Sequence, residues 1–266
     1  MKEIVGVLGQ NLTLSAELGS AGDYYIRLHD YSSASSISLY SLKAGFTDFY
    51  IKNVSDSPDP FSPNADGQKD NTTIAATITA AGNWTINIKD SGGALKRTYS
   101  GTGSSINMAW DGKDGSANVV ADGTYTYTID ATNPVNGKIA PTVSGTVQVD
   151  STLPTATISS PIENDTVSGT VSILGTASDN NFSNYKVEYG QGAAPSSWIL
   201  INSSSTSVTN GLLATWDSLK VNNGIYTIRL TVNDAAGNIS TAQVKVNVDN
   251  IQITSVSIST NVINPA

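Results

Sequence analysis

Residues 224–238 read Gly-Ile-Tyr-Thr-Ile-Arg-Leu-Thr-Val-Asn-Asp-Ala-Ala-Gly-Asn. Apolar side chains alternate with polar ones along this stretch, with Tyr226, Ile228, Leu230 and Val232 on one side. A period of two gives a β-strand one apolar face and one polar face, as in an antiparallel sheet that is buried on one side only. The closing Ala236-Gly237-Asn238 is typical of a turn. The stretch therefore predicts a half-buried strand that ends in a tight turn.

The same pattern recurs along the chain, and no stretch of ten or more residues has helical periodicity. Apolar residues alternate with polar ones at Trp84–Ile88, Tyr125–Ile129 and Val244–Val248. Turn dipeptides separate such stretches, and the clearest of them are Asp111-Gly112, Asp122-Gly123, Asn210-Gly211 and Asn223-Gly224. Asn-Gly and Asp-Gly supply the positive φ angles that tight hairpins need. Short strands at this spacing predict an all-β protein built of antiparallel β-sandwiches.

The composition narrows the range of functions. The 266 residues carry a net charge of −8, and only 14% of them are charged. We expect no nucleic-acid partner, because binding to phosphates needs clustered Lys and Arg. The sequence has no cysteine, which excludes disulfides and thiolate chemistry, and it has no apolar run long enough to span a membrane as a helix. A pI near 4.5 favours divalent cations as ligands.

The pattern of strands and prolines divides the chain into modules. Exit strands end at Val149-Asp150 and at Val248-Asp249, and Pro154 blocks strand pairing after the first of them. We expect β-sandwich domains at 51–150 and 151–250, joined by a linker so short that the joint is stiff. Residues 1–50 are predicted to be the C-terminal part of a preceding β module. Residues 251–266 are predicted to begin a following repeat, because their alternating strand and Asn-Pro resemble 50–64.

The two predicted modules share an internal signature. Trp110-Asp111 precedes Gly123-Thr124-Tyr125, and Trp216-Asp217 precedes Gly224-Ile225-Tyr226. The pattern predicts a core Trp and then a Tyr early in the next strand, whose hydroxyl reaches back to the backbone as in the tyrosine corner of Greek-key sandwiches. We interpret these Trp residues as core residues rather than as platforms for sugars.

These motifs resemble known families. Asp59-Pro60-Phe61-Ser62-Pro63-Asn64-Ala65-Asp66-Gly67, followed by Trp110–Gly115 and Val119–Tyr125, is similar to the Ig-like domain of FlgD, the flagellar hook-cap protein. Ser168–Val171, Gly175–Asp179 and Tyr226–Asn238 resemble bacterial Ig-like and fibronectin-III-like surface modules. The resemblance implies tandem Ig-like antiparallel β-sandwiches without catalytic activity, in a bacterial protein that is secreted or lies on the cell surface.

The strongest candidate for a metal site is the segment Asn64-Ala65-Asp66-Gly67-Gln68-Lys69-Asp70. In the register of an EF-hand loop, Gly67 takes the sixth position, and the predicted calcium ligands are Ser62, Asn64, Asp66, Gln68 and Asp70. A Ser stands at the first position and Thr73 at the twelfth, and strands rather than helices follow, so the loop is not an EF-hand. The alternative is a network of Asx turns in which backbone N–H groups satisfy the same side chains.

Two further acidic groups are weaker candidates for metal sites. Asp111, Asp114 and Asp122 form one, although Asp-Gly turn chemistry explains them without a metal. Asp179, Asp234 and Asn238 form the other, which we place at one end of the second sandwich.

Little in the sequence supports an enzymatic function. His29 is the one histidine, and the chain has no G-x-S-x-G nucleophile elbow, no P-loop and no dinucleotide fingerprint. A pair of glycosidase carboxylates is not excluded by spacing. We therefore predict that the protein is not an enzyme.

We expect a structural or adhesive segment whose Ig-like modules act as stalk or assembly units, with calcium as a stiffening ion. The expected partners are neighbouring modules of the same protein or other copies. Ile251–Ile258 either joins a neighbouring copy by strand addition or folds back on its own chain. The alternative is an accessory module that binds a surface carbohydrate or protein through Asn180–Asn184 or Gly190–Trp198. In that alternative Trp198 is the candidate ligand-binding residue.

Overall fold

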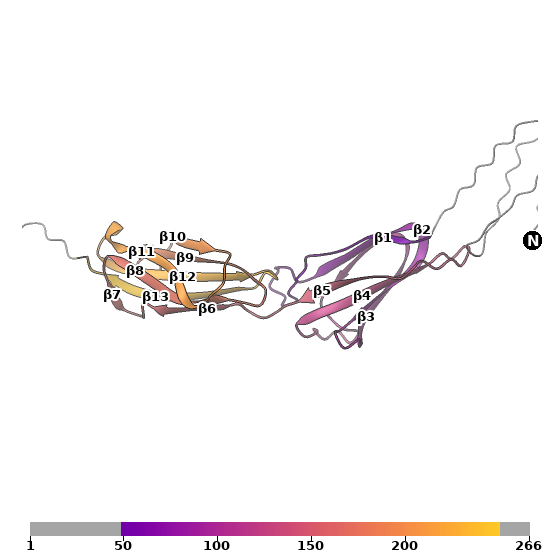
Figure 1. The fold of residues 1–266 in the computed structure, drawn as a ribbon, viewed down its shortest axis with the longest axis horizontal. Coiled ribbons are helices and arrows are strands. Elements are labelled where there is room, and N and C mark those ends of the chain that lie inside the picture. The colour runs from indigo at the N-terminus through magenta and orange to yellow at the C-terminus, as the bar shows by residue number, and fades with distance from the viewer. Residues whose placement is uncertain (1–48, 251–266) are drawn as a thin grey trace, which may run out of the picture.

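The computed structural model describes residues 49–250. It contains thirteen β-strands and one short 3₁₀ helix (η1, Ser218–Lys220), which confirms the predicted all-β class with antiparallel sandwiches. Figure 1 shows two elongated sandwiches arranged end to end, and we call them module 1 and module 2. The expectations for 1–48 and 251–266, which include His29 and the strand-addition segment, lie outside the described residues.

Module 1 contains five strands: β1 (Ile51–Ser57), β2 (Thr72–Lys89), β3 (Leu95–Trp110), β4 (Gly123–Thr132) and β5 (Val143–Val149). β2 is long enough to serve both layers. Its first half pairs with β1 and its second half with β4, while β3 accompanies both halves. The register shifts between Thr77 and Gly82, where a Cβ on Gly82 would lie 2.7 Å from the ring of Phe49. A glycine at this position lets the long strand pass from one layer to the other.

Module 2 has two sheets. One has the order β10-β9-β12-β13-β7 and the other β11-β8-β6. The strands are β6 (Thr155–Ser160), β7 (Asp165–Val167), β8 (Thr170–Ser178), β9 (Phe182–Gln191), β10 (Ile199–Ser204), β11 (Val208–Asp217), β12 (Gly224–Asp234) and β13 (Ile239–Val248). β7 runs parallel to β13, and the other pairings are antiparallel.

The predicted Trp signature lies in both cores. Trp110 is fully buried between Phe61 and Tyr125, with ring centroids 5.4 and 5.2 Å away in edge-to-face geometry. The Tyr125 hydroxyl donates to the carbonyl of Ala121 at 2.7 Å, which is the predicted tyrosine corner. Trp216 is buried in module 2 with its ring centroid 5.8 Å from that of Tyr226. The packing of these rings supports the core interpretation over a sugar platform.

Candidate functional site at the junction between the modules

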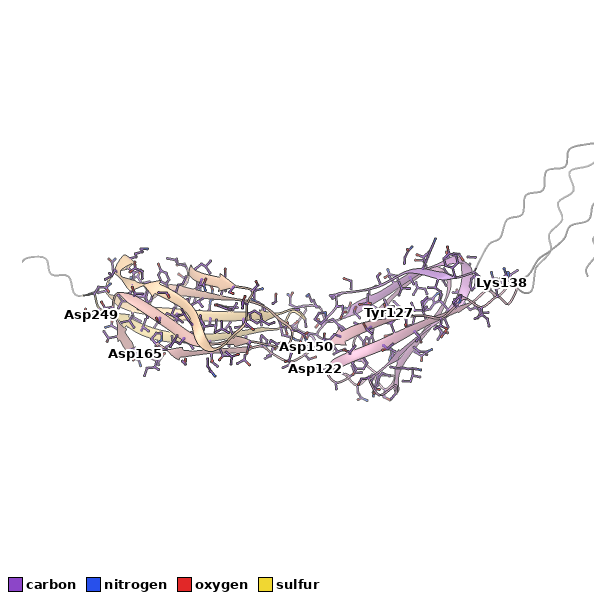
Figure 2. All side chains as sticks on the ribbon, in the orientation of Figure 1. Asp122, Tyr127, Lys138, Asp150, Asp165 and Asp249 are labelled. Carbon is purple, nitrogen blue, oxygen red and sulfur yellow. The ribbon has the colours of Figure 1, made fainter. Side chains whose placement is uncertain are left out.

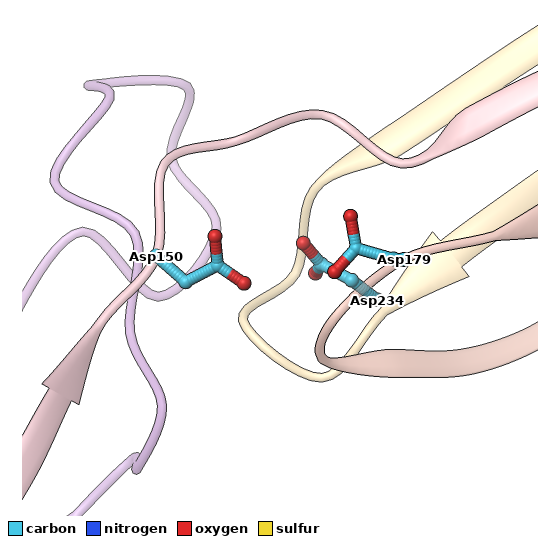
Figure 3. Close-up of side chains that lie close together, drawn as sticks. All are labelled: Asp150, Asp179 and Asp234. Carbon is cyan, nitrogen blue, oxygen red and sulfur yellow. The ribbon is translucent and has the colours of Figure 1, made fainter. Parts of the chain in front are cut away.

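The junction between the two modules is where residues distant in the sequence meet. A short connection, Asp150–Pro154, leaves β5 and enters β6. Beside it, the loop 62–70 of module 1 lies against the turn Ala235–Asn238 of module 2, which joins β12 to β13. Figure 3 shows how the connection passes the ends of the module 2 strands.

Asn238 is the centre of this junction. Its side chain is fully buried. Its Oδ1 accepts hydrogen bonds from Ser62 Oγ at 2.7 Å and from Asn64 Nδ2 at 3.1 Å. Its Nδ2 donates to the backbone carbonyls of Asp150 at 2.9 Å and of Thr152 at 3.2 Å. One carboxamide of module 2 therefore uses both of its polar atoms to bind module 1 and the connection.

The sequence of the β12–β13 turn explains why Asn238 is held so firmly. Asp234 Oδ1 accepts hydrogen bonds from the backbone N–H groups of Gly237 at 2.7 Å and Asn238 at 2.8 Å, and Gly237 has a φ of +101°. This is an Asx-type turn that needs a residue free to adopt positive φ. Asp234 Oδ2 also accepts from Asn238 Nδ2 at 2.7 Å.

The module 1 side of the junction is equally constrained. Phe61 forms a parallel bridge with Val149, and its carbonyl accepts the N–H of Asp150 at 3.0 Å. The N–H of Ser62 donates to the carbonyl of Lys69 at 2.9 Å, which closes the loop 62–70. Ser62 has no exposed surface. These backbone bonds fix the hydroxyl of Ser62 where Asn238 can reach it. The Lys69 ammonium donates to the carbonyl of Ala235 and adds a second contact between the modules.

Three carboxylates converge beside Asn238. Asp150 from the connection, Asp179 after β8 and Asp234 at the end of β12 each offer one oxygen, and these oxygens lie within 4.8 Å of one another. Figure 3 shows the Asp150 carboxylate directed towards the other two. Asp150 and Asp234 are buried, and Asp150 Oδ2 accepts from Asn181 Nδ2 at 2.6 Å. None of the ion pairs found within residues 49–250 involves this carboxylate cluster.

The electrostatics of the carboxylate cluster are unfavourable without a cation. The pKa of Asp179 is raised above its usual value of 3.8, first by burial and then by repulsion from Asp150 and Asp234, although its bonds to backbone N–H groups lower it. Like charges that share a partly buried site disfavour the ionised form. All the side-chain ligands on offer are carboxylate oxygens, which suit a hard cation such as Ca²⁺.

The loop predicted as the calcium site has a different geometry. Asp66 Oδ1 accepts the N–H of Gln68 at 2.7 Å, and Asp70 Oδ2 accepts the N–H of Gly67 at 2.9 Å. Ser62 Oγ donates to Asn238, and Asn64 Nδ2 donates both to Asn238 and to Asp66 Oδ2, at 3.1 and 3.0 Å. The bonds to the backbone are those of the Asx-turn interpretation. The Asp70 Oδ1 atom is buried without a hydrogen-bond partner. Calcium binding by Ser62, Asn64, Asp66, Gln68 and Asp70 stays a prediction.

The acidic group of Asp111, Asp114 and Asp122 is held by bonds to backbone N–H groups. Asp111 accepts from the N–H of Lys113, and Asp114 accepts from the N–H groups of Ser116 and Asn118. Asp122 Oδ1 accepts the N–H of Ser151 at 2.8 Å, which anchors the connection to module 1. Turn chemistry accounts for Asp111 and Asp114, and the bond to the connection accounts for Asp122.

Trp198 is half-buried, and one face of its indole is already occupied. The guanidinium of Arg229 lies 3.9 Å from the ring centroid. Arg229 also forms an ion pair with Glu188 at 2.7 Å. A sugar ring could stack on that face only by displacing Arg229. The other candidate loop, Asn180–Asn184, faces the junction, since Asn181 binds Asp150. The role of Trp198 in ligand binding stays a prediction.

Sequence reasoning placed Asp179, Asp234 and Asn238 together at one end of module 2, and the structure brings these residues together. It did not place Asp150 with them, nor did it identify Asn238 as the contact with Ser62. The available signal was the Val-x-Val-Asp exit strand before the linker, which puts an aspartate at the point where module 2 begins.

The fold and the junction define two β-sandwiches in tandem. Residues 62–134 match the model of the FlgD Ig-like domain, and residues 154–230 match that of a bacterial Ig domain. The chain thus carries a FlgD Ig-like domain followed by a bacterial Ig domain, which confirms the resemblance seen in the sequence. No curated protein matches.

Two solved structures are among those with detectable similarity to this chain. One is described as a tetra-tandem repeat in the extending region of a large adhesion protein, with 19% identity, a TM-score of 0.31, and coverage of 76% of this chain and 50% of that one. The other is red sea bream transglutaminase, with 10% identity, a TM-score of 0.27, and coverage of 77% and 32%. The chain thus spans half the length of the first and about a third of the second. Among the described residues, no helix is long and apolar enough to cross a membrane.

Proposed function

We propose that this chain is a non-catalytic spacer from a bacterial surface or secreted protein, in which two Ig-like modules are held at a fixed angle. The burial of Asn238 between the modules carries this proposal. A joint held only by a flexible tether would leave the ends of the two modules solvated. Here one carboxamide bonds to Ser62, to Asn64 and to the connection. The partner that these residues bind is therefore the neighbouring module.

The stiffness of such a joint sets how far a stalk reaches. Two sandwiches in line transmit force along their long axis, and a joint that cannot bend keeps the outermost module away from its base. Short linkers and interdomain hydrogen bonds restrict the motion that is otherwise the default between domains. The presence of bacterial Ig modules favours a location outside the cell or on its surface.

Calcium is proposed as the ion that stiffens this joint, with Asp150, Asp179 and Asp234 as ligands. The carboxylate cluster spans both modules, because Asp150 belongs to the exit of module 1 and the other two to module 2. A bound divalent cation would offset the repulsion that raises the pKa of Asp179. The ion would then stabilise the joint by mass action in proportion to its concentration over its Kd.

Calorimetric titration with Ca²⁺, with thermal melts alongside, tests this. Asp179→Asn removes one carboxylate of the cluster without touching the bonds of Asn238. Asp66→Ala and Asp70→Ala address the loop 62–70, and Asp111→Asn is the matched control on an exposed turn. Loss of binding in Asp179→Asn alone supports the joint site, and loss in the two loop variants alone locates the ion in the loop. Absence of binding at millimolar Ca²⁺ in the unaltered chain refutes both sites but leaves the spacer proposal intact.

Small-angle scattering and distance measurements between the modules test the spacer itself. We expect a single, narrow interdomain arrangement in the unaltered chain. A broad, bent ensemble would refute the proposal, whatever the calorimetry shows.

A further inference from the structure

The far end of module 2 is built like the far end of module 1. In module 1, the residue after the last residue of β5 is Asp150, whose N–H donates to the carbonyl of Phe61 at 3.0 Å. In module 2, the residue after β13 is Asp249, whose N–H donates to the carbonyl of Val167 at 3.1 Å. Both carbonyls belong to a segment that runs parallel to the exit strand. Figure 2 shows Asp150 at the junction and Asp249 at the opposite end of module 2.

The next residue is equivalent in the two modules as well. The N–H of Ser151 donates to Asp122 Oδ1 at 2.8 Å, and the N–H of Asn250 donates to Asn223 Oδ1 at 2.9 Å. Asp122 and Asn223 each precede the glycine that begins β4 or β12, and each glycine pairs with the last valine of the exit strand. Ser151 and Asn250 therefore occupy the same position at the ends of their modules.

A serine hydroxyl lies at the same place in both ends and binds a carboxamide in both. Ser62 follows Phe61 and donates to Asn238 of the next module at 2.7 Å. Ser168 follows Val167 and donates to Oδ1 of Asn250 at 3.1 Å. The carboxamide is supplied by the following module in one case and by the module's own chain in the other.

Asn250 fits the site that it fills. Its side chain is 6% exposed. Its Nδ2 donates to the carbonyl of Ser218 at 2.8 Å, and its Oδ1 accepts from the hydroxyl of Ser218 at 3.3 Å. Ser151 is too short to reach Ser62 in the same way, and its Oγ is buried without a hydrogen-bond partner.

Two neighbouring positions carry different residues in the two module ends. Gly112 of module 1 lies under Pro63, where an added Cβ would be 2.6 Å from the proline ring. In module 2, Ser218 takes the position of Gly112 after the Trp-Asp pair, and Gly169 takes that of Pro63. The N–H of Ser218 donates to the carbonyl of Gly169 at 2.9 Å. Module 2 thus gains the hydroxyl that module 1 lacks, and this hydroxyl binds Asn250.

We propose that the residue after the exit aspartate decides whether the end of a module docks another module. A short residue, as at Ser151, leaves a socket at Ser62 for the asparagine of a following Ig-like module that carries an Asp-Ala-Ala-Gly-Asn turn. An asparagine, as at Asn250, fills the equivalent socket from the module's own chain. The inference rests on the proposed spacer function, because it takes the joint at Asn238 as the docked state.

The test exchanges the two residues and measures the distance between the modules. The chain has no cysteine, so Ser105→Cys and Ser205→Cys, both exposed, give one spin label in each module. In this background, Ser151→Asn supplies a carboxamide to Ser62 in competition with Asn238. We expect the single narrow distance to be lost, and we expect Ser151→Ala, the matched control, to retain it. Retention of the narrow distance in Ser151→Asn would overturn the inference.

The reciprocal experiment replaces Asn250 at the end of module 2 and asks whether a further module then docks there. A second copy of residues 152–250 is joined directly after position 250, and spin labels are placed at Ser205 of both module 2 copies. We expect a narrow distance when position 250 is Ser and a broad one when it is Asn. Equal distributions for the two would overturn the inference. A broad distance between modules 1 and 2 of the unaltered chain would instead refute the proposed spacer function, so the two failures are distinguishable.

Discussion

Replacing Asn238 with Ala is the sharpest test of the joint, because this one side chain makes several of the hydrogen bonds that cross it. The asparagine makes five side-chain hydrogen bonds, to Ser62, Asn64, Asp234 and the carbonyls of Asp150 and Thr152. Four of them reach module 1 or the connection. A net hydrogen bond contributes about 0.5–1.5 kcal/mol, and a buried polar group left without a partner costs about 1–3 kcal/mol.

The bonds to Asn64 and Thr152 are the longest of the five, at 3.1 and 3.2 Å, and Asn64 is exposed and can turn to water. The Ser62 hydroxyl and the Asp150 carbonyl then account for most of the loss. We expect Asn238→Ala to lower the free energy of unfolding by about 2–4 kcal/mol. For a module of this size, the expected fall in Tm is about 10 °C or more.

Differential scanning calorimetry together with the interdomain distance measures both consequences. Asn233→Ala is the matched control, because Asn233 lies at the end of β12, just before the turn, and its side chain bonds to Asn184 within module 2. We expect this control to keep the interdomain distance and to change the Tm little. If Asn238→Ala keeps both the Tm and a narrow interdomain distance, the junction does not fix the modules and the reasoning fails.

Three further outcomes follow from the structure. Because the pKa of Asp179 is raised in the fold, its contribution to stability is present at acid pH and is lost as the pH rises through the folded-state pKa. In a pH series of thermal melts without calcium, Asp179→Asn should reduce the fall of Tm with rising pH. An unchanged dependence of Tm on pH would contradict the argument. Tyr127 donates to Asp56 at 2.7 Å, so Tyr127→Phe should destabilise module 1 by about 1–3 kcal/mol in urea unfolding, and a neutral effect would show that water replaces the hydroxyl. Trp198→Ala removes the stacking on Arg229 and should lower the stability of module 2 by about 0.5–2 kcal/mol; a stability loss without any change in sugar binding would leave Trp198 as a structural residue.

The fold class and the two cores can be predicted from the sequence alone. Tyr226, Ile228 and Leu230 alternate as a strand packed on a second layer requires, and all three are buried. The predicted polar face is not fully exposed, however: Thr227 is buried as well, and its hydroxyl donates to the carbonyl of Gly192 at 2.8 Å. The Trp-Asp and Gly-x-Tyr signature likewise identified Trp110 and Trp216 as core residues. These features follow from local periodicity and turn chemistry, which depend only on residues close together in the sequence.

The joint between the modules cannot be predicted from the sequence. Asn238 and Ser62 are 176 positions apart, and nothing in the local pattern of either residue specifies the other. The convergence of Asp150 with Asp179 and Asp234 depends on how the connection leaves β5 and on where the ends of β8 and β12 meet it. Residue types and spacing predict which side chains can bond or bind a cation. Which of these side chains share one site depends on how the two modules are placed relative to each other. Contacts between residues far apart in the sequence set that placement.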